Sequence, residues 1–255
     1  MLMPWSPWSL VRYIIEYYGL QDTPAASWVA VGGVFACMVI PYLLGSLNFG
    51  VILSRAKYKD DVRTHGSGNA GTTNMLRTYG KGAAALTLLG DMLKAVVAMI
   101  FGYFMLVSPI VKDGRVIGVD LLGPAIAGLF VMLGHMFPCF FHFKGGKGVA
   151  TAAMVVLMTD WMVFLILLAI FVIIAAGTKF VSLASIMGLI FYPIILYAFD
   201  GAGTASMVAV IMALLVVYMH RENIKRLRAG TESKLSFKKK AAEDTSADKT
   251  SADKA

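Results

Sequence analysis

The sequence predicts an all-α integral membrane protein with about seven transmembrane helices, its N-terminus outside and its C-terminus in the cytoplasm. Three observations lead to this: an apolar composition, a series of long apolar runs, and an uneven distribution of basic residues. Apolar residues make up 58% of the 255 residues and charged residues only 15%, with a mean hydropathy of +0.72. A soluble domain is about 45–50% apolar and about 25% charged.

Six apolar runs supply the candidate spans, since a membrane-crossing helix needs about 20 mostly apolar residues. The runs are 28–53, 82–107, 121–143, 149–178, 180–199 and 204–219. The second run contains Asp91 and Lys94, three residues apart. Charges are costly in lipid unless they are paired, so we expect these two side chains to form a structural ion pair.

Basic residues set the predicted orientation. Segment 55–81 holds six basic residues, and the chain from residue 221 onward holds ten, whereas loop 108–120 holds two, which its two aspartates offset. Because basic loops stay on the cytoplasmic side, segment 55–81, the loop around residues 144–147 and the C-terminus are predicted to be cytoplasmic.

The number of membrane crossings limits how many helices the long run 149–178 can form. The loops before and after it face the cytoplasm, so the crossings between them must be even in number, and 180–199 and 204–219 supply two. We therefore expect 149–178 to form two short helices hinged at residues 159–161. The first, of about 11 residues, spans roughly 16 Å, less than the roughly 30 Å apolar core. Whether the pair makes two full crossings or a re-entrant hairpin stays open.

Both ends of the chain differ in character from the predicted membrane domain, residues 28–237. Residues 1–27 mix aromatic and charged residues with three prolines, which predicts an interfacial amphipathic extension. Residues 238–255 are polar and repetitive, which predicts a disordered cytoplasmic tail.

Segment 63–77 is the first of three polar cytoplasmic segments. Glycines allow backbone N–H groups to approach an anion, hydroxyl and amide side chains add donors, and an arginine can bind an oxyanion through two hydrogen bonds. The candidate binding residues are Gly66, Ser67, Gly68, Asn69, Thr73, Asn74 and Arg77. A turn-rich connector is the alternative, because Gly, Ser and Asn also favour turns.

The second segment places Lys144, Gly145, Gly146 and Lys147 directly before an apolar helix. Backbone amides, two ammonium groups and a helix N-terminus together predict a phosphate site, although the P-loop spacing is absent. A basic turn flanking the membrane is the alternative. Nearby, His135 is expected to be a hydrogen-bonded structural residue.

The third segment follows the last apolar run. His220 and Asn223 share one helical face, where histidine could exchange a proton and asparagine could orient a polar substrate. A basic stop signal would explain the segment equally well. Ser182, at the start of another helix, could reach the same pocket.

The catalogue of reactive groups excludes several chemistries. The four histidines are scattered, no metal-ligand spacing occurs and no Ser-His-Asp order is present. We therefore expect no metal, no cofactor and no nucleic-acid partner.

Two anion loops at a membrane surface suggest group transfer between two phosphorylated substrates, at least one of them amphipathic. Anion transport is the rival, although the sequence shows no internal repeat of the kind that transporters carry.

Five stretches, 42–50, 66–77, 134–151, 181–185 and 220–227, resemble the motifs of the bacterial acyl-phosphate:glycerol-3-phosphate acyltransferase family (PlsY), in family order. The resemblance implies transfer of a fatty acyl group from acyl phosphate to the 1-hydroxyl of sn-glycerol 3-phosphate, giving lysophosphatidic acid. It also implies seven helices in the bacterial inner membrane, an active site that faces the cytoplasm, contact with membrane lipid and no requirement for CoA.

The resemblance also implies roles for individual residues. Ser67 and Arg77 match essential residues that hold phosphate and developing charge, and His220 and Asn223 match residues linked to activity. Gly145, Gly146 and Lys147 match a loop associated with glycerol 3-phosphate, whereas Glu222, together with Ser46 in the first motif, is expected to be structural. The proton of the acceptor hydroxyl goes either to His220 or to a substrate phosphate, and the sequence leaves both open.

Overall fold

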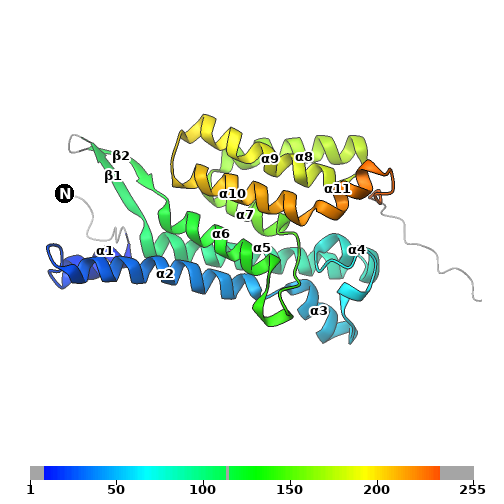
Figure 1. The fold of residues 1–255 in the computed structure, drawn as a ribbon, viewed down its shortest axis with the longest axis horizontal. Coiled ribbons are helices and arrows are strands. Elements are labelled where there is room, and N and C mark those ends of the chain that lie inside the picture. Colours follow the sequence, from blue (N-terminus) through cyan, green and yellow to red (C-terminus); the bar gives the residue numbers. More distant parts are fainter. Residues whose placement is uncertain (1–8, 113–114, 236–255) are drawn as a thin grey trace, which may run out of the picture.

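The computed structural model describes residues 9–112 and 115–235, which form two layers of long, nearly parallel helices (Figure 1). One layer contains α2 (Pro24–Ser46), α5 (Lys81–Leu106) and α6 (Leu122–Met136). The other contains α8 (Trp161–Thr178), α9 (Val181–Asp200) and α10 (Thr204–Met219), and the short α7 (Val149–Thr159) joins the layers.

Short elements gather at the two ends of these layers. At one end lie α3 (Phe49–Tyr58), the 3-10 turns η1 (Val62–Thr64) and η2 (Cys139–Phe141), α4 (Thr72–Tyr79) and α11 (Arg221–Arg228). At the other end lie α1 (Leu10–Tyr17) and the antiparallel hairpin of β1 (Ser108–Lys112) and β2 (Arg115–Asp120). The three polar segments of the sequence therefore meet at one end of the molecule.

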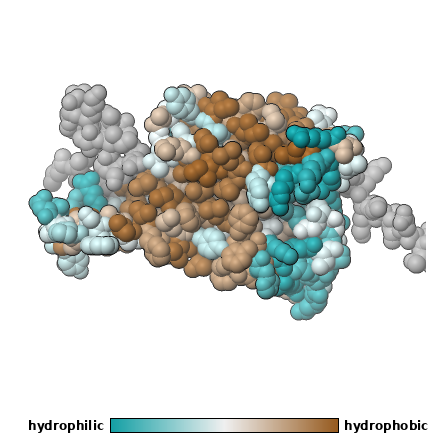
Figure 2. Space-filling model, viewed as in Figure 1, coloured by the Kyte–Doolittle hydropathy of each residue, from teal (hydrophilic) through white to brown (hydrophobic). Residues whose placement is uncertain are grey.

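On the face shown in Figure 2, apolar residues cover the middle of the helices and hydrophilic residues lie at the ends. Five helices are long and apolar enough to cross a membrane, or six if α10 and α11, which meet at a bend of 57°, form one span. At 11 residues α7 is shorter than these spans. The fold is thus that of an integral membrane protein with five or six candidate spans.

The break within residues 149–178 is confirmed. α7 ends at Thr159 and α8 begins at Trp161, and the Asp160 carboxylate between them accepts hydrogen bonds from the amides of Met162 (2.7 Å) and Val163 (2.8 Å). An aspartate at the N-cap satisfies amides that a new helix leaves unpaired, so this residue starts α8.

One sequence prediction needs correction. Loop 108–120 is a β-hairpin, so the described chain is not purely helical, although helices form all of its layers. The first apolar run is confirmed as a candidate span, and within it α2 ends at Ser46, where Asn48 accepts a hydrogen bond from Val51 N and starts α3. Residues 1–8 and the whole predicted tail, 238–255, lie outside the described residues.

Glycine residues allow the backbones of α2 and α6 to come into direct contact. A Cβ atom built on Gly45 would overlap the carbonyl oxygen of Val131, and one built on Gly134 would overlap that of Tyr42. Close approach through small residues is a common way to associate helices in lipid, where burial of apolar surface contributes little. The contact fixes the position of the residues that follow Ser46 and His135, which belong to the polar end.

We predict that Gly134→Ala destabilises the protein by about 1–3 kcal/mol, because the methyl group must force α2 and α6 apart. The measurement is thermal unfolding in detergent. Gly177→Ala in α8, where a Cβ would meet nothing within 4 Å, is the matched control and should leave the midpoint unchanged. Equal midpoints for both variants would contradict the close packing.

Candidate active site

A cleft of about 1810 Å³ lies at the polar end and runs between the two helical layers. Its polar half is lined by segment 66–81, the loop before α7, α11 and the segment that follows α11. Its other half is lined by apolar side chains of α5, α7, α8 and α9, among them Leu88, Met92, Phe164, Leu167, Phe171 and Leu189. The cleft can therefore hold a molecule with one charged and one hydrocarbon part.

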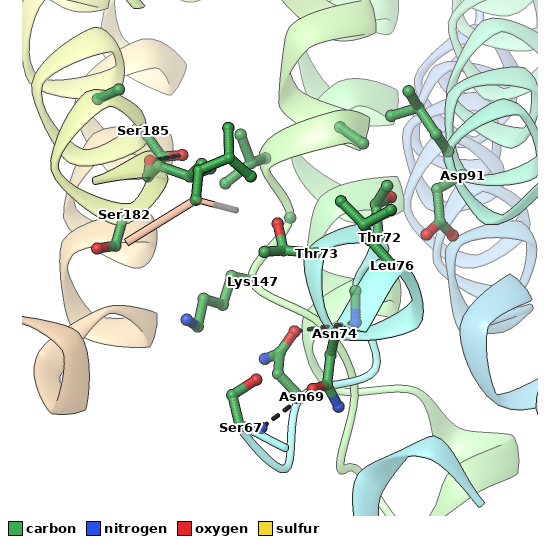
Figure 3. A pocket seen from close by; sticks show the side chains of 18 of the residues that line it. Ser67, Asn69, Thr72, Thr73, Asn74, Leu76, Asp91, Lys147, Ser182 and Ser185 are labelled. Atoms are coloured by element: carbon green, nitrogen blue, oxygen red, sulfur yellow. Dashed lines mark hydrogen bonds between the residues drawn. The ribbon is translucent and has the colours of Figure 1, made fainter. Parts of the chain in front are cut away.

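Asn74 fastens the first polar segment into a loop. Its side-chain nitrogen donates to the carbonyl oxygens of Val62 and His65, both at 2.9 Å, and its oxygen accepts from Ser67 N at 3.0 Å (Figure 3). Gly66 has a φ of +55°, and a Cβ there would overlap the Asn74 oxygen. The Asn74 amide is occupied by the backbone of the loop, so it shapes the site instead of contacting a ligand.

The loop that Asn74 shapes presents Ser67 and Arg77 to the cleft. Both side chains are exposed and both residues line it. Among residues 9–112 and 115–235, no hydrogen bond or ion pair is found for the Arg77 guanidinium. Gly71, which precedes α4, gives no side-chain cap to the first amides of that helix.

Arg63 joins the first polar loop to the second. Its guanidinium pairs with Asp61 at 2.7 Å and donates to the carbonyl oxygens of Phe141 (3.0 Å) and Lys144 (2.9 Å). Hydrogen bonds from Arg63 hold the pKa of the Asp61 carboxyl well below its usual range. The two loops, about 80 residues apart in sequence, are thereby held as one unit.

Glu232 organises the third part of the site, although the sequence analysis did not select it. One carboxylate oxygen accepts from Ser182 Oγ (2.7 Å) and from Asn223 Nδ2 (2.6 Å). The other accepts from Arg226 Nε at 2.7 Å. The segment that carries Glu232 is tied back to α9 by a hydrogen bond from Leu235 N to the carbonyl oxygen of Lys179, at 2.7 Å.

Lys147 extends into the cleft between Thr73 on α4 and Ser182 on α9 (Figure 3). Its ammonium donates to Asn223 Oδ1, and Glu232 holds the same asparagine from the other side. Burial lowers the pKa of Lys147 to about 8, which the Glu232 carboxylate partly opposes. Burial acts to raise the pKa of Glu232, but the hydrogen bonds from Ser182 and Asn223 outweigh it and lower that pKa.

His220 is buried at the junction of α10 and α11 and lines the cleft. Its Nδ1 lies 2.8 Å from the carbonyl oxygen of Val216. A carbonyl can only accept, so Nδ1 carries the proton and Nε2 is the free acceptor. Burial, with the nearby Lys147 charge, lowers the pKa of His220 to about 4, so the ring is neutral at physiological pH.

Gly145 and Gly146 do not present free amides to the cleft. Gly145 N donates to the carbonyl oxygen of Met136 (3.2 Å), and Gly146 N to that of His135 (3.1 Å). The predicted phosphate loop is therefore folded against the end of α6, and Lys147 is its contribution to the cleft. Lys144 points to solvent and does not line the cleft.

The cleft brings together most of the residues predicted from the sequence. Those that line it are Gly66, Ser67, Asn69, Thr73, Asn74, Arg77, His135, Lys147, Ser182, His220 and Asn223. Those that do not are Ser46, Gly68, Lys144, Gly145, Gly146 and Glu222.

Two of the residues outside the cleft have clear local partners. Glu222 is exposed and forms a surface ion pair with Lys225 at 3.0 Å. Ser46 is buried, where it donates to the carbonyl oxygen of Tyr42 (2.9 Å) and accepts from Cys139 N (3.3 Å).

Sequence reasoning missed Glu232 and Arg226 as partners of the site, and it missed the apolar half of the cleft. Glu232 follows the helix-ending Gly230 and resembles an ordinary surface residue in the sequence. Glu232 lies four residues after Arg228, but the helix ends between the two residues, so this spacing does not predict a helical ion pair. Within the described residues, no group of three or more His, Cys, Asp or Glu side chains could hold a metal ion.

The fold and the cleft define the class: a helical membrane protein whose cleft joins cationic side chains to an apolar lining. The family model described as Glycerol-3-phosphate acyltransferase matches residues 35–230. The chain belongs to this family.

Relatives and solved structures agree with this assignment. A glycerol-3-phosphate acyltransferase of Paraburkholderia phytofirmans is 42% identical over 203 residues, 80% of this chain and 91% of its own. That of Clostridioides difficile is 41% identical over 202 residues, 79% of this chain and 95% of its own. The crystal structure of PlsY (YgiH), an integral membrane glycerol 3-phosphate acyltransferase, in its glycerol 3-phosphate form has a TM-score of 0.70 at 35% identity and covers 80% of this chain and 96% of its own.

We predict that Glu232→Ala lowers acyltransferase turnover by about 10–100-fold, because charge-assisted hydrogen bonds of about 1.5–3 kcal/mol each position Asn223 and Ser182. Glu232→Gln keeps an acceptor oxygen but loses the pair with Arg226, so its loss should be smaller. Initial rates on folded protein measure both effects. Glu222→Ala, at the exposed pair with Lys225, is the comparison and should stay within about twofold; a larger loss there than at Glu232 would reverse the two assignments.

Proposed function

We propose that this protein transfers a fatty acyl group from acyl phosphate to the 1-hydroxyl of sn-glycerol 3-phosphate, giving lysophosphatidic acid and phosphate. The observation that carries the proposal is the continuity of the cleft: its cationic half suits two phosphates, and its apolar half suits an acyl chain. The PlsY relative has crystal structures in glycerol 3-phosphate and lysophosphatidic acid forms, which supports the same acceptor and product here.

The roles follow from the charges. Arg77 and Lys147 supply cations at the cleft, and Ser67 and Thr73 add hydroxyl donors. An arginine can bind a phosphate through two parallel hydrogen bonds, whereas a lysine acts as a point charge. Asn223 and Ser182, both held by Glu232, line the same space and orient the polar groups of the acceptor.

The reaction needs no covalent enzyme intermediate, since acyl phosphate is a mixed anhydride and already activated. The 1-hydroxyl oxygen attacks the acyl carbonyl carbon, and the bond from that carbon to the phosphate oxygen breaks. Positioning the two substrates and stabilising the oxyanion are the main contributions of the protein.

The hydroxyl proton has two possible acceptors. His220 Nε2 is free to accept a hydrogen bond, but its pKa of about 4 makes it a weak base in the free enzyme. A phosphate has a second pKa of about 6 and binds a proton more strongly. The substrate phosphate is therefore the better final acceptor, and His220 serves to orient the hydroxyl.

The proposed placement has seven helices in the bacterial inner membrane, N-terminus outside, with the cleft facing the cytoplasm. It is supported by the gathering of α3, α4, α11 and the basic loops at one end of the helices, opposite α1 (Figure 1). α7 and α8 are then consecutive crossings, and the neighbouring helices α5 and α6, which contact α7, shield its short span.

The experiment is an assay of the purified protein in detergent with acyl phosphate and labelled glycerol 3-phosphate, without added metal. Equal amounts of phosphate and labelled lysophosphatidic acid would establish the reaction and its donor, with acyl-CoA as the control donor. Binding of glycerol 3-phosphate without any product would favour transport of a phosphorylated solute instead.

We predict that Arg77→Ala lowers kcat/KM by about 100–1000-fold, the cost of one lost charge-stabilising donor. The fold should survive, since the Arg77 side chain is exposed. Arg77→Lys should remain impaired because an ammonium cannot bind bidentately. Arg228→Ala, another exposed arginine outside the cleft, is the control; full activity of Arg77→Ala would remove its assigned role.

We predict that kcat/KM for glycerol 3-phosphate falls as the pH rises above about 8, because the Lys147 ammonium loses its proton there. The pKa is lower than that of a free lysine, so the charge that attracts phosphate is present below pH 8 and absent above it. kcat/KM reports groups of the free enzyme. Lys147→Arg keeps its charge throughout, so the alkaline limb should vanish; a limb that persists would assign it to another group.

A further inference from the structure

A cluster of three ionisable side chains lies between α2, α5 and α6, at the wall of the cleft, which Asp91 and His135 line. Lys94 Nζ lies 2.8 Å from Asp91 Oδ1 and 3.0 Å from His135 Nδ1. It also donates to the carbonyl oxygens of Gly45 and Leu47, both at 2.9 Å, where α2 ends. The predicted ion pair of Asp91 and Lys94 is confirmed, with side chains 1% and 3% exposed.

The cluster fixes the orientation of the His135 ring. Its Nδ1 lies 3.0 Å from Lys94 Nζ and 3.3 Å from Asp91 Oδ1, so both charged groups hold the same side of the ring. The Asp91 carboxylate balances the Lys94 charge beside it. Since the Lys94 ammonium is held by the two α2 carbonyls, the ring is tied to the backbone at the end of α2.

His135 in turn supports the loop that carries Lys147. Its carbonyl oxygen accepts from Gly146 N at 3.1 Å, and a Cβ built on Gly146 would overlap the Nε2 side of its ring. The loop therefore rests on both the backbone and the imidazole of one residue. Lys147 follows Gly146 directly, so the position of its ammonium depends on this contact.

We propose that the Asp91–Lys94–His135 cluster is a positioning device for Lys147, and that residue 146 is a glycine because it packs on the His135 imidazole. The inference rests on the proposed function for the role of Lys147 as the cation that attracts glycerol 3-phosphate. A displacement of about 1 Å at a positioned group can cost about 100-fold, so a fixed ring beneath the loop has a direct effect on affinity.

The test is a double-mutant cycle of Gly146→Ala and His135→Asn. Gly146→Ala should raise the KM for glycerol 3-phosphate at least tenfold, because the methyl group pushes the loop off the ring. Asparagine keeps a polar group near the Nδ1 position, beside Lys94 and Asp91, but removes the Nε2 side of the ring. The methyl group added by Gly146→Ala then takes the space that the Nε2 side of the ring leaves, so adding His135→Asn to Gly146→Ala should bring the KM back to within about threefold of the wild type. His135→Asn alone leaves that space empty and should raise the KM, with the KM for acyl phosphate unchanged in all variants.

The proposal would be overturned if the double variant had a KM for glycerol 3-phosphate as high as the product of the two single effects, or higher. That result would mean that a smaller residue 135 does not relieve the Gly146→Ala substitution. Gly177→Ala, which meets nothing within 4 Å, is the matched control. If wild-type protein binds glycerol 3-phosphate but transfers no acyl group, the proposed function fails, and the ratios of Kd measured by titration calorimetry still decide the positioning.

A second variant covers the case in which His135→Asn does not fold. Asp91→Leu with Lys94→Met removes both charges together, which avoids an unpaired buried charge and often preserves stability. It should fold, raise the KM for glycerol 3-phosphate about tenfold and leave the KM for acyl phosphate unchanged. A folded double variant with an unchanged KM for glycerol 3-phosphate would also overturn the proposal.

Discussion

Holding a lysine ammonium in a half-apolar cleft is the constraint on which the rest of the site depends. Burial lowers the pKa of Lys147 to about 8, and the Glu232 carboxylate opposes this shift. Asn223 accepts its hydrogen bond, and Glu232 places a carboxylate behind that asparagine. The same carboxylate holds Ser182 and Arg226, so one acidic side chain at the end of the described chain joins α9, α11 and the loop before α7.

The cationic end is built without relying on flexible surface lysines. Arg63 bonds the carbonyls of the second loop, Asn74 closes the first, and Lys94 anchors the end of α2. Each of these side chains donates to backbone carbonyl oxygens of a neighbouring segment and so holds that segment in place. Together they hold the polar half of the cleft against its apolar half.

Much of the architecture was predictable because lipid imposes simple rules. The apolar runs, the break before Trp161 and the Asp91–Lys94 pair follow from length, capping and the cost of charge in hydrocarbon. The hairpin at 108–120 was not predicted, because a short segment outside the apolar runs carries no span signal.

The sequence by itself determined the class of fold and the three segments that meet at the site, because glycine, hydroxyl and basic residues at membrane boundaries have few other uses. Only the tertiary structure decided what each residue does. In the folded protein the amides of Gly145 and Gly146 bond carbonyl oxygens at the end of α6, and the Asn74 side chain bonds the backbone of its own loop. The Glu232 carboxylate accepts a hydrogen bond from Asn223. The physical reason is that hydrogen-bond partners far apart in sequence are chosen by packing, which short-range spacing cannot reveal.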